Sequence, residues 1–495
     1  MPVITIDNKK IEVTAGTTVL KAALENGIYI PHYCWHPLLS ISGNCRMCVV
    51  EIEGRPKLEV SCNLVAADGM VIKTDTPAVK KMRKSVLEFL LINHPIDCPI
   101  CDQAGECLLQ DYHFKCSGQA SRFKEEKVHK SKVVDAGRHI KLDNERCILC
   151  TRCVRFCQEV VKEPELTVAI RGDRSFITTA PGKTLDNPYS LNTVDICPVG
   201  ALTSKDFRFK KRVWFLKSTP SVCPHCSNGC PIWIDHADEI MYRWRPRQEI
   251  EKVNGIASSQ LTGNTILCDE GRLSYGEWQS DTKISKPLML EEGEHKEISR
   301  AEAVLKLNKI LSKDMKEIIA VLSAQISCEE ADAFVKFLRE KAGTDKIYRS
   351  GRAPLNPTSD DIIRKADKNP NISYLEKMGL RELPANIEGD VLFVTDSLSK
   401  DDILKTANLK WKSIVQITHD KRLIVPGAEI ILPRATFAES EGTFVNFNGV
   451  KRKFSPAFKP AGEARTIAGW IPFLEEGITG VMSFLRKQES SDRLI

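Results

Sequence analysis

Fifteen cysteines and one histidine fall into four sets whose spacing suits the binding of iron. The sets are Cys34, Cys45, Cys48 and Cys62; His94, Cys98, Cys101 and Cys107; Cys147, Cys150, Cys153 and Cys197; and Cys223, Cys226, Cys230 and Cys268. Each set has the four ligands that an iron–sulfur cluster needs, and thiolate is the ligand that these clusters select. Four such sets in one chain predict a protein that carries single electrons.

The composition indicates a soluble globular protein. Its 495 residues are enough for several domains of about 150 residues each. Charged residues make up 27% and hydrophobic residues 42%, which excludes general disorder. The formal charge is +6, but lysines and arginines do not form a run with interleaved aromatic residues, so we do not expect nucleic-acid binding. The sequence has no run of about eighteen apolar residues, so we expect no membrane span.

The N-terminus and the cysteine spacing predict the redox compartment. Residues 1–13 alternate between apolar and polar side chains, as a strand does, and differ from a signal or transit peptide. The cysteines occur in short clusters within a large chain, whereas a disulfide-bonded secreted protein is small and rich in cysteine throughout. We therefore expect reduced thiols that act as ligands, and a cytoplasmic protein.

The first set lies in a segment that we expect to be rich in β-structure. Strands are predicted at residues 3–6 and 11–13 around a turn at residues 8–10, followed by a helix over residues 19–26. Gly43 lies in the ligand loop, where glycine lets backbone amides approach the cluster sulfurs. The spacing resembles the [2Fe–2S] domain of respiratory NADH dehydrogenases and some hydrogenases, which has a β-grasp fold. The alternative is a zinc knuckle.

The second set follows a predicted amphipathic helix. This helix covers residues 79–92, with an apolar face formed by Val79, Met82, Val86, Phe89 and Leu90. Pro95 disfavours further helix and extends the ligand loop. A single histidine is usually structural, but His94 supplies the fourth donor to a set with three cysteines. The motif resembles the [4Fe–4S] site of the same family. Because imidazole is neutral and thiolate anionic, we expect a raised cluster potential.

The third set has the C-x2-C-x2-C run of a [4Fe–4S] ferredoxin, beginning at Cys147, and a distant Cys-Pro pair at Cys197. Cys157 occupies the position at which a two-cluster ferredoxin has a ligand for its second cluster. Gln158 replaces the expected proline there, and no second run lies near Cys197. We therefore interpret Cys157 as a buried thiol. Residues 195–203 resemble the respiratory NADH dehydrogenase family at this point.

The fourth set resembles the cluster-bearing N-terminal region of molybdopterin oxidoreductases. In that family, C-x2-C-x3-C followed by a variable gap and C-D-x-G-[RK] binds a [4Fe–4S] cluster. Residues 223–230 and 268–272 match this pattern. Taken alone, the same thiols would also suit a structural zinc site. The gap between the two parts is long and polar around Asn254–Asn264, so we expect a loop insertion.

The C-terminal part carries no further ligand set. Helices and strands are predicted to alternate, which indicates an α/β domain: helices at residues 301–311 and 329–341, and buried strands at residues 318–323 and 390–395. Cys328 lies at a predicted helix start and is interpreted as a core or capping residue. Residues 435–446 resemble a late segment of molybdopterin-oxidoreductase-like domains. The sequence offers no glycine-rich nucleotide motif.

Taken together, the four sets resemble the large iron–sulfur subunit of bacterial NADH–quinone oxidoreductases, which belongs to the peripheral arm of respiratory complex I. The resemblance implies one [2Fe–2S] cluster at the first set and [4Fe–4S] clusters at the other three, with the sixteen side chains as iron ligands. It also implies a multidomain α+β and α/β fold. The domains would be residues 1–78, a β-grasp [2Fe–2S] ferredoxin-type domain; 79–118, a [4Fe–4S] domain with one histidine and three cysteine ligands; 119–215, a [4Fe–4S] ferredoxin-like domain; 216–272, a molybdopterin-oxidoreductase-type [4Fe–4S] domain; and 273–495, a shortened molybdopterin-oxidoreductase-like α/β domain.

The function implied by this resemblance is electron transfer within a proton-translocating NADH:quinone oxidoreductase. The chain would accept electrons from the flavin-bearing subunit that oxidises NADH and pass them towards quinone. A flavin takes two electrons as hydride, whereas clusters carry electrons one at a time. The implied partners are the flavin subunit and other iron–sulfur subunits of the peripheral arm, on the cytoplasmic side of the inner membrane. Because the C-terminal domain is shorter than is usual in the family, we expect no molybdopterin.

Two alternatives remain at this level. An electron-transfer subunit of an NAD-linked hydrogenase or formate dehydrogenase shares the first three motifs. An iron hydrogenase would need more cysteines than Cys328 after Cys268, and a formate dehydrogenase would need a full molybdopterin domain. The other alternative is a scaffold that binds zinc and has no redox activity, which metal analysis distinguishes from an iron–sulfur protein.

Overall fold

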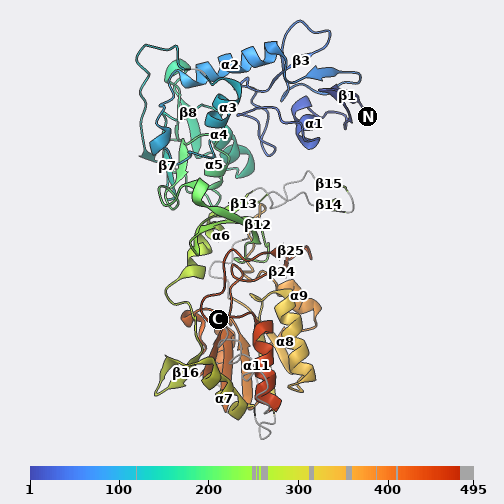
Figure 1. Cartoon of the computed structure of the whole chain (residues 1–495), viewed down its shortest axis with the longest axis vertical. Coiled ribbons are helices and arrows are strands. Elements are labelled where there is room, and N and C mark those ends of the chain that lie inside the picture. The colour runs from blue at the N-terminus through green and yellow to red at the C-terminus, as the bar shows by residue number, and fades with distance from the viewer. Residues whose placement is uncertain are drawn as a thin grey trace, which may run out of the picture. The chain divides into compact units, whose positions relative to one another are not determined.

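The computed structural model describes residues 1–118, 120–247, 252–253, 256–257, 266–311, 317–352, 359–385, 387–407 and 411–479. The chain forms two compact units, Met1–Leu216 and Lys217–Ile495 (Figure 1). All of the first three ligand sets belong to the N-terminal unit, and the fourth belongs to the C-terminal unit. The polar stretch around Asn254–Asn264, where an insertion is expected, and the chain after Thr479 lie almost entirely outside the described residues.

The N-terminal unit begins with a five-stranded sheet of β1 (Val3–Ile6), β2 (Lys9–Glu12), β3 (Val49–Ile52), β4 (Glu59–Val60) and β5 (Val71–Lys73). The strand order is β2-β1-β5-β3-β4, in which only the β1–β5 pair is parallel. Helix α1 (Val19–Glu25) packs on the sheet, because its Leu20 and Ala23 lie in one hydrophobic core with Ile4 and Ile6. The expected β-rich start of the chain is therefore confirmed.

The first hairpin turns earlier than the sequence pattern predicts. Asp7 and Asn8 form the turn, both with left-handed backbone conformations at φ +46° and +70°. Asparagine and aspartate tolerate this conformation better than most residues, so the second strand begins at Lys9. The following helix ends at Glu25, one residue earlier than predicted, and Gly27 at φ +76° follows its C-cap residue Asn26.

Helix α2 (Pro77–Leu91) leads the chain to the second ligand set. Thr76 caps its N-terminus by accepting a hydrogen bond from the Val79 amide. The predicted apolar face is partly wrong, because Met82 is 40% and Phe89 74% exposed. Arg83 is buried instead, and its Nη2 donates to the Val49 carbonyl at 3.0 Å. The packed stripe therefore includes the aliphatic stem of an arginine, which a purely apolar pattern does not reveal.

Short elements connected by loops form the rest of this unit. They are α3 (Leu108–Cys116), β6 (Val134–Asp135), β7 (Ile140–Leu142), α4 (Arg152–Arg155), β8 (Leu166–Ala169), β9 (Phe176–Thr179), α5 (Asn192–Asp195) and β10 (Leu202–Ser204), with single turns at Cys98–Ile100, Phe156–Val160, Gly172–Arg174 and Val213–Phe215. Strands β10, β7 and β6 form one antiparallel sheet, and β8 and β9 a hairpin. The ligand loops of the second and third sets lie between these elements.

The C-terminal unit starts with an antiparallel sheet of β11 (Lys217–Val222), β12 (Pro231–Ala237) and β13 (Ile240–Pro246). Two short strands follow, β14 (Lys252–Val253) and β15 (Ile256–Ala257), and then α6 (Asp269–Leu273) and a single-turn segment, Ser274–Gln279. The first three cysteines of the fourth set lie on the turn between β11 and β12, and the last one directly precedes α6.

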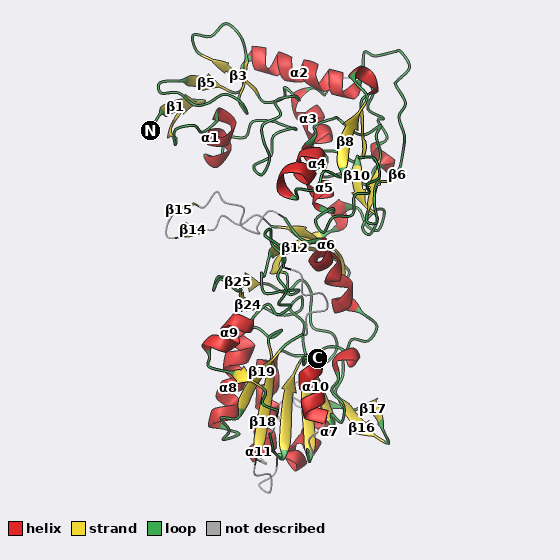
Figure 2. Cartoon of the chain, turned by 180° about the vertical axis from the view of Figure 1, so that it is seen from behind, coloured by secondary structure: helices red, strands yellow, loops and turns green. Residues whose placement is uncertain are grey.

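An eight-stranded sheet forms the centre of the C-terminal unit (Figure 2). Its strands, in spatial order, are β17 (Glu294–Glu297), β16 (Leu288–Glu291), β23 (Ile430–Pro433), β22 (Ser413–Thr418), β21 (Val391–Thr395), β18 (Ile318–Ser323), β19 (Ile347–Ser350) and β20 (Arg381–Glu382). The strands from β23 to β20 are all parallel, and the β16–β17 hairpin is added antiparallel at one edge. The two predicted strands are confirmed as β18 and β21.

Helices cover both faces of this sheet. They are α7 (Arg300–Ile310), α8 (Cys328–Glu340), α9 (Ile372–Lys377), α10 (Lys400–Ala407) and α11 (Ile467–Thr479), and a hairpin of β24 (Gly442–Val445) and β25 (Lys451–Phe454) lies near α8. One hydrophobic core joins α7, α8 and α11 to the sheet through buried residues such as Phe334, Phe393 and Trp470. The predicted α/β domain is therefore confirmed, with α7 and α8 where the sequence places helices.

In the part of the chain that the structure describes, no helix has the length and apolar character needed to cross a bilayer.

Candidate iron–sulfur sites

The four thiols of the first set lie in contact with one another. Side-chain hydrogen bonds connect Cys34 with Cys45 and Cys62, and Cys48 with Cys62. The bonds from Cys45 and Cys62 lower the pKa of Cys34, and the bond from Cys62 lowers the pKa of Cys48. The same bonds raise the pKa of Cys45 and Cys62, which act as donors. The four sulfurs of the set therefore converge at one place.

Backbone amides also point at these sulfurs. The Cys34 amide donates to Cys45 Sγ at 3.5 Å, and the amides of Asn44 and Met47 bond to Cys34 and Cys45. Gly43 has φ +63°, a left-handed conformation that other side chains rarely adopt. The glycine therefore shapes a loop in which amide–sulfur bonds form, and such bonds are among the factors that set a cluster potential.

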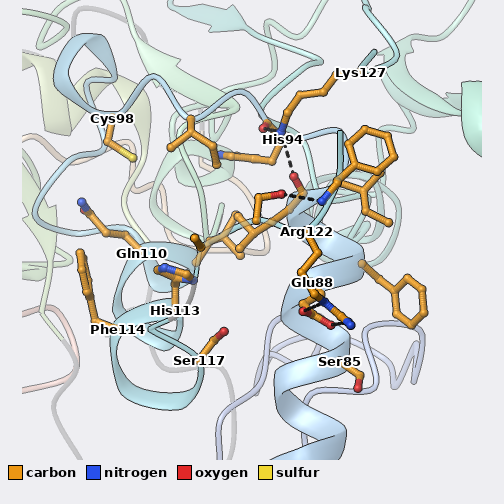
Figure 3. A pocket seen from close by; sticks show the side chains of 18 of the residues that line it. Ser85, Glu88, His94, Cys98, Gln110, His113, Phe114, Ser117, Arg122 and Lys127 are labelled. Atoms are coloured by element: carbon orange, nitrogen blue, oxygen red, sulfur yellow. Dashed lines mark hydrogen bonds and ion pairs between the residues drawn. The ribbon is translucent and has the colours of Figure 1, made fainter. Parts of the chain in front are cut away.

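Three members of the second set line one cavity. His94, Cys98 and Cys107 lie on the wall of a hollow of about 760 Å³ (Figure 3). Cys101 lies close to them, since its charge would raise the pKa of Cys107. Burial lowers the pKa of His94 to about 4, so the ring is neutral at physiological pH. Its buried Nδ1 has no hydrogen-bond partner among the described residues. A neutral ring with a free buried nitrogen fits a metal ligand.

Lys127 fixes the loop that carries His94. Its ammonium donates to the carbonyl of His94 at 2.7 Å and to that of Leu91 at 3.0 Å (Figure 3). The Val128 amide donates to Asn93 Oδ1 at 3.0 Å on the same loop. Pro95 cannot continue the backbone hydrogen bonds of the helix, and these bonds take their place. They hold His94 in position after the end of α2.

The thiols of the third set also line one small cavity. Cys147, Cys150, Cys153 and Cys197 share it with apolar neighbours such as Leu202. Burial raises the pKa of each of these thiols, to about 12 for Cys147 and about 11 for Cys150. Without iron, the thiols of this site would stay protonated and neutral. A bound iron cluster would supply the positive charge that displaces their protons.

The run from Cys147 to Cys153 bends through two left-handed residues. Leu149 has φ +53° and Thr151 φ +59°. This conformation brings the Leu149 amide to 3.4 Å from Cys147 Sγ, and the Arg152 amide bonds to Cys150. Such strain in residues other than glycine is uncommon and clusters at functional sites.

Gly200 lies where the loop after Cys197 of the third set contacts the loops of the second set. A Cβ atom at this position would lie 2.3 Å from Cys101 Sγ and 3.0 Å from Gln103 Cβ. The Leu108 amide, directly after Cys107, donates to the Pro198 carbonyl at 3.0 Å. The loop after Cys197 therefore packs directly on the loops of the second set, and this approach requires glycine.

Substitution of Gly200 by alanine tests this contact. We expect G200A to disturb the second set specifically, because the added methyl group overlaps Cys101 Sγ, at a cost of about 1–3 kcal/mol in the free energy of unfolding. Low-temperature EPR of the reduced protein and urea denaturation measure the two effects. Gly276→Ala is the control, since its Cβ would meet no atom within 4 Å. An unchanged cluster spectrum in G200A would contradict the contact.

The fourth set is buried in the C-terminal unit. Cys223, Cys226, Cys230 and Cys268 are each at most 8% exposed, and burial raises the pKa of all four. A Cβ atom on Gly271 would lie 3.1 Å from Cys268 Sγ and 3.3 Å from Cys223 Sγ, so the glycine of the C-D-x-G-R motif lets the chain approach both thiols. The structure therefore brings Cys268 to the other three across the long gap.

Amide donors surround the fourth set as well. Asn228 Nδ2 donates to Cys230 Sγ at 2.9 Å, and the Gly271 amide donates to Cys268 Sγ at 3.3 Å. Among the described residues, no three histidine, cysteine or carboxylate side chains converge closely enough to hold a single metal ion.

Three of the four sets border a single hydrophobic core. Buried Cys34 and Cys150 belong to it together with Tyr33 and Tyr112, and Cys45, Cys107, Cys147 and Cys197 pack against it. The Tyr33 and Tyr112 rings lie 5.0 Å apart. Members of the first, second and third sets therefore border one apolar core.

The three cysteines outside the sets have other surroundings. Cys157 is fully buried, and burial raises its pKa to about 12, but it does not line the cavity of the third set. Cys328 is the first residue of α8, as predicted, although Ser327 is the capping residue. Cys116 ends α3 and is half-buried.

The sequence patterns did not reveal the arginines that support the ligand loops. Arg146 forms an ion pair with Asp97, beside Cys98, at 2.8 Å, and Arg212 donates to the Cys101 carbonyl at 2.6 Å. Arg155 donates to carbonyls of the first and third sets, and Arg152 to carbonyls of residues next to them. The basic residues inside the C-x2-C-x2-C run could have suggested such contacts. Their partners are distant in sequence, so the sequence does not show which groups they bind.

Four family models match successive parts of the chain. They are the 2Fe-2S iron-sulfur cluster binding domain at residues 3–77, the NADH-ubiquinone oxidoreductase-G iron-sulfur binding region at 83–122, the ferredoxin-like domain of NADH-quinone oxidoreductase subunit 3 at 137–203, and molybdopterin oxidoreductase at 301–470. These matches define a multidomain iron–sulfur protein with 2Fe-2S and 4Fe-4S binding domains.

Curated relatives identify the family more closely. The G subunit of NADH-quinone oxidoreductase from Rickettsia conorii is 42% identical over 342 residues, which are 69% of this chain and 49% of the relative. The G subunit from Streptomyces coelicolor is 38% identical over 70% of this chain and 40% of the relative. The mitochondrial NADH dehydrogenase iron-sulfur protein 1 of Solanum tuberosum is 38% identical over 75% of this chain and 49% of the relative.

Over this matched stretch the chain is similar to the G subunits of NADH-quinone oxidoreductase. It spans about half the length of the curated relatives it matches. Among solved structures, a chain of an NAD+-reducing [NiFe]-hydrogenase is 34% identical over 43% of this chain and 91% of that chain, with a TM-score of 0.39.

Proposed function

We propose that this chain is the electron-transfer subunit of a proton-translocating NADH–quinone oxidoreductase. It receives electrons from a flavin-bearing subunit that oxidises NADH and passes them, one at a time, through its clusters towards quinone. Its partners are that flavin subunit and other iron–sulfur subunits of the peripheral arm, on the cytoplasmic side of the inner membrane. The chain itself needs no acid, base or nucleophile, because clusters change charge by single electrons.

The observation that carries this proposal is the shared hydrophobic core of the first three sets. Thiols from all three border one interior that also holds Tyr33 and Tyr112. A relay requires clusters that are close together and shielded from water, and a chain of independent structural metal sites would not require a common core. The names of the relatives support the same assignment.

The proposed cofactors are one [2Fe–2S] cluster at the first set and [4Fe–4S] clusters at the other three. The sixteen side chains of the four sets are the iron ligands, within the five domains predicted at residues 1–78, 79–118, 119–215, 216–272 and 273–495. The helix α1 packed on a mixed sheet supports a β-grasp assignment for the first domain. When bound, the clusters supply reversible one-electron chemistry; the chain holds them, excludes water and adjusts their potentials.

Metal analysis combined with low-temperature EPR of the dithionite-reduced protein tests this proposal. We expect about fourteen irons per chain, with the signals of one [2Fe–2S] and three [4Fe–4S] clusters. About ten irons per chain would exclude a [4Fe–4S] cluster at the fourth set and leave the other three cluster assignments intact. A colourless protein loaded with zinc would contradict the whole proposal.

Replacement of His94 by cysteine tests the mixed ligand set. We expect H94C to keep the cluster and to lower its midpoint potential, because an anionic thiolate stabilises the oxidised cluster more than a neutral imidazole does. An EPR-monitored potentiometric titration measures the change, with the third cluster in the same sample as the internal reference. An unchanged or higher potential would count against His94 as a ligand.

A further inference from the structure

Two buried arginines lie between the loops of the first and third sets. Arg152 and Arg155 are only 7% and 8% exposed. Both are on α4: Arg152 lies within the C-x2-C-x2-C run of the third set, and Arg155 lies two residues after it. Their guanidinium groups reach back to the loop of the first set, more than a hundred residues earlier in the chain. One helical turn thus connects two candidate cluster sites.

Arg155 bridges the two sets through a single nitrogen. Its Nη2 donates to the carbonyl of Cys34 at 2.6 Å and to that of Cys150 at 3.2 Å. Nη1 donates to the Ser40 carbonyl, and Nε to Thr151 Oγ1 at 3.3 Å. Cys34 is a member of the first set and Cys150 of the third. The guanidinium group therefore holds the main chain at one ligand of each set.

Arg152 makes the same kind of connection beside the ligands. Its Nη2 donates to the Trp35 carbonyl at 2.6 Å, and its Nη1 to the Ile196 carbonyl at 3.1 Å. Trp35 follows Cys34 directly, and Ile196 precedes Cys197. The Nε atom is buried and has no hydrogen-bond partner in the described structure. Burial lowers the pKa of Arg152.

The charge balance of this region is unusual. All acceptors of the two guanidinium groups in the described residues are neutral oxygens. Burial of a cation without an anionic partner is costly, and buried arginines are normally paired with carboxylates. Thiolates of the neighbouring sets are groups that could compensate the two charges. Consistent with this, burial raises the pKa of Cys150, and the charges of Arg152 and Arg155 oppose that rise.

We propose that Arg155, assisted by Arg152, is a shared counter-ion that raises the midpoint potentials of the clusters at the first and third sets and fixes their spacing. Reduction adds one negative charge to a cluster, and a nearby cation in a dry interior stabilises the reduced form. One cation between two clusters raises both potentials together. Arg155 is thus a positioning residue that acts on the clusters through the ligand loops. This inference rests on the proposed function, since it requires clusters at both sets.

EPR-monitored potentiometric titration of the full chain with its clusters tests the proposal. We expect R155Q to retain the iron content and to lower the midpoint potentials of the [2Fe–2S] cluster and of the third-set [4Fe–4S] cluster, with little effect on the cluster at His94. R155K should restore most of both potentials, because the ammonium keeps the charge. R152Q should shift the same two clusters in the same direction. Arg171→Gln removes an exposed arginine of the same unit and should change nothing.

Each outcome decides the proposal. Unchanged potentials in an iron-replete R155Q protein would overturn it, as would an equal shift in R171Q. If R155Q loses iron, the R155K variant distinguishes the two roles of Arg155. An R155K protein that keeps its clusters, with potentials near those of the wild type, supports the role of Arg155 as a counter-ion. Loss of iron in both variants would mean that Arg155 has a purely structural role, and would overturn the proposal. Absence of clusters from the wild-type protein would instead overturn the proposed function, so the two failures are distinguishable.

Discussion

Substitution of Cys153 by serine is expected to remove one complete [4Fe–4S] cluster from the protein. Cys153 is 8% exposed and lines the same cavity as the other three thiols of the third set. A serine hydroxyl is a poor iron ligand, so the iron content should fall by about four per chain, and one [4Fe–4S] EPR signal should disappear. Because cluster binding contributes to folding free energy, we also expect the N-terminal unit to be strongly destabilised. Cys197→Ser should have the same effect.

Cys157 provides the matched control for this experiment. It lies four residues after Cys153 and is fully buried, but it does not line the cavity. We expect C157S to keep all clusters, at a cost of about 1 kcal/mol in the free energy of unfolding, because the thiol acts as a small apolar group. Substitution of Cys116 or Cys328 should likewise leave every signal intact. Loss of a cluster in C157S would mean that the third set has been assigned wrongly.

The proximity of the thiols could be predicted from the sequence because most of each set is local. Cysteines two or three residues apart on a loop necessarily lie close together, and the structure brings Cys147 and Cys150 to one cavity as expected. The distant members, Cys197 and Cys268, were predictable because a four-ligand count left one place open and because each lies in a short motif, Cys-Pro and C-D-x-G-R, that resembles known cluster-binding families. The strands β18 and β21 were equally predictable, since buried parallel strands are continuous apolar runs.

Long-range contacts of polar groups could not be predicted in the same way. The buried face of α2 includes Arg83, whose partner is a carbonyl on β3, so its apolar pattern misplaced Phe89. Arg155 belongs to a cysteine motif, but its acceptor on Cys34 is 121 residues away. Hydrogen bonds to main-chain carbonyls carry no sequence signature at the acceptor, because every residue has a carbonyl.

A buried charge network lies at the carboxyl ends of the parallel strands of the C-terminal unit. Arg434, 2% exposed, follows β23 and forms ion pairs with Glu330 at 2.6 Å and with Asp396 at 3.2 Å. Asp396 follows β21, is fully buried, and also contacts His419 Nδ1 at 2.7 Å. The His419 ring stacks on Trp278 with centroids 4.9 Å apart. Arg434 therefore contacts two buried carboxylates, one of which, Asp396, also contacts His419.

Substitution of Arg434 by methionine should destabilise the C-terminal unit by about 3–5 kcal/mol, because it leaves Glu330 and Asp396 buried without their cation. Urea denaturation followed by near-UV circular dichroism measures the loss. Arg339 on α8 is the matched control: its ion pair with Asp345 is exposed, so R339M should cost less than about 1 kcal/mol. Equal losses in the two variants would contradict a special role for the buried network.

The effect of Arg434 on stability should also depend on pH. Burial acts to raise the pKa of Asp396, but the charges of His419 and Arg434 outweigh it and hold that pKa well below its usual range. A carboxyl whose pKa is lowered in the folded state stabilises the protein above its unfolded pKa of about 3.9, and this contribution is lost as the pH falls below that value. The wild type loses the stabilising contribution of Asp396 on acidification, whereas R434M has already lost much of that contribution at neutral pH. The difference in unfolding free energy between the two proteins should therefore narrow as the pH falls below about 4, and a difference that stays constant over this range would show that Asp396 does not depend on Arg434 for its charge.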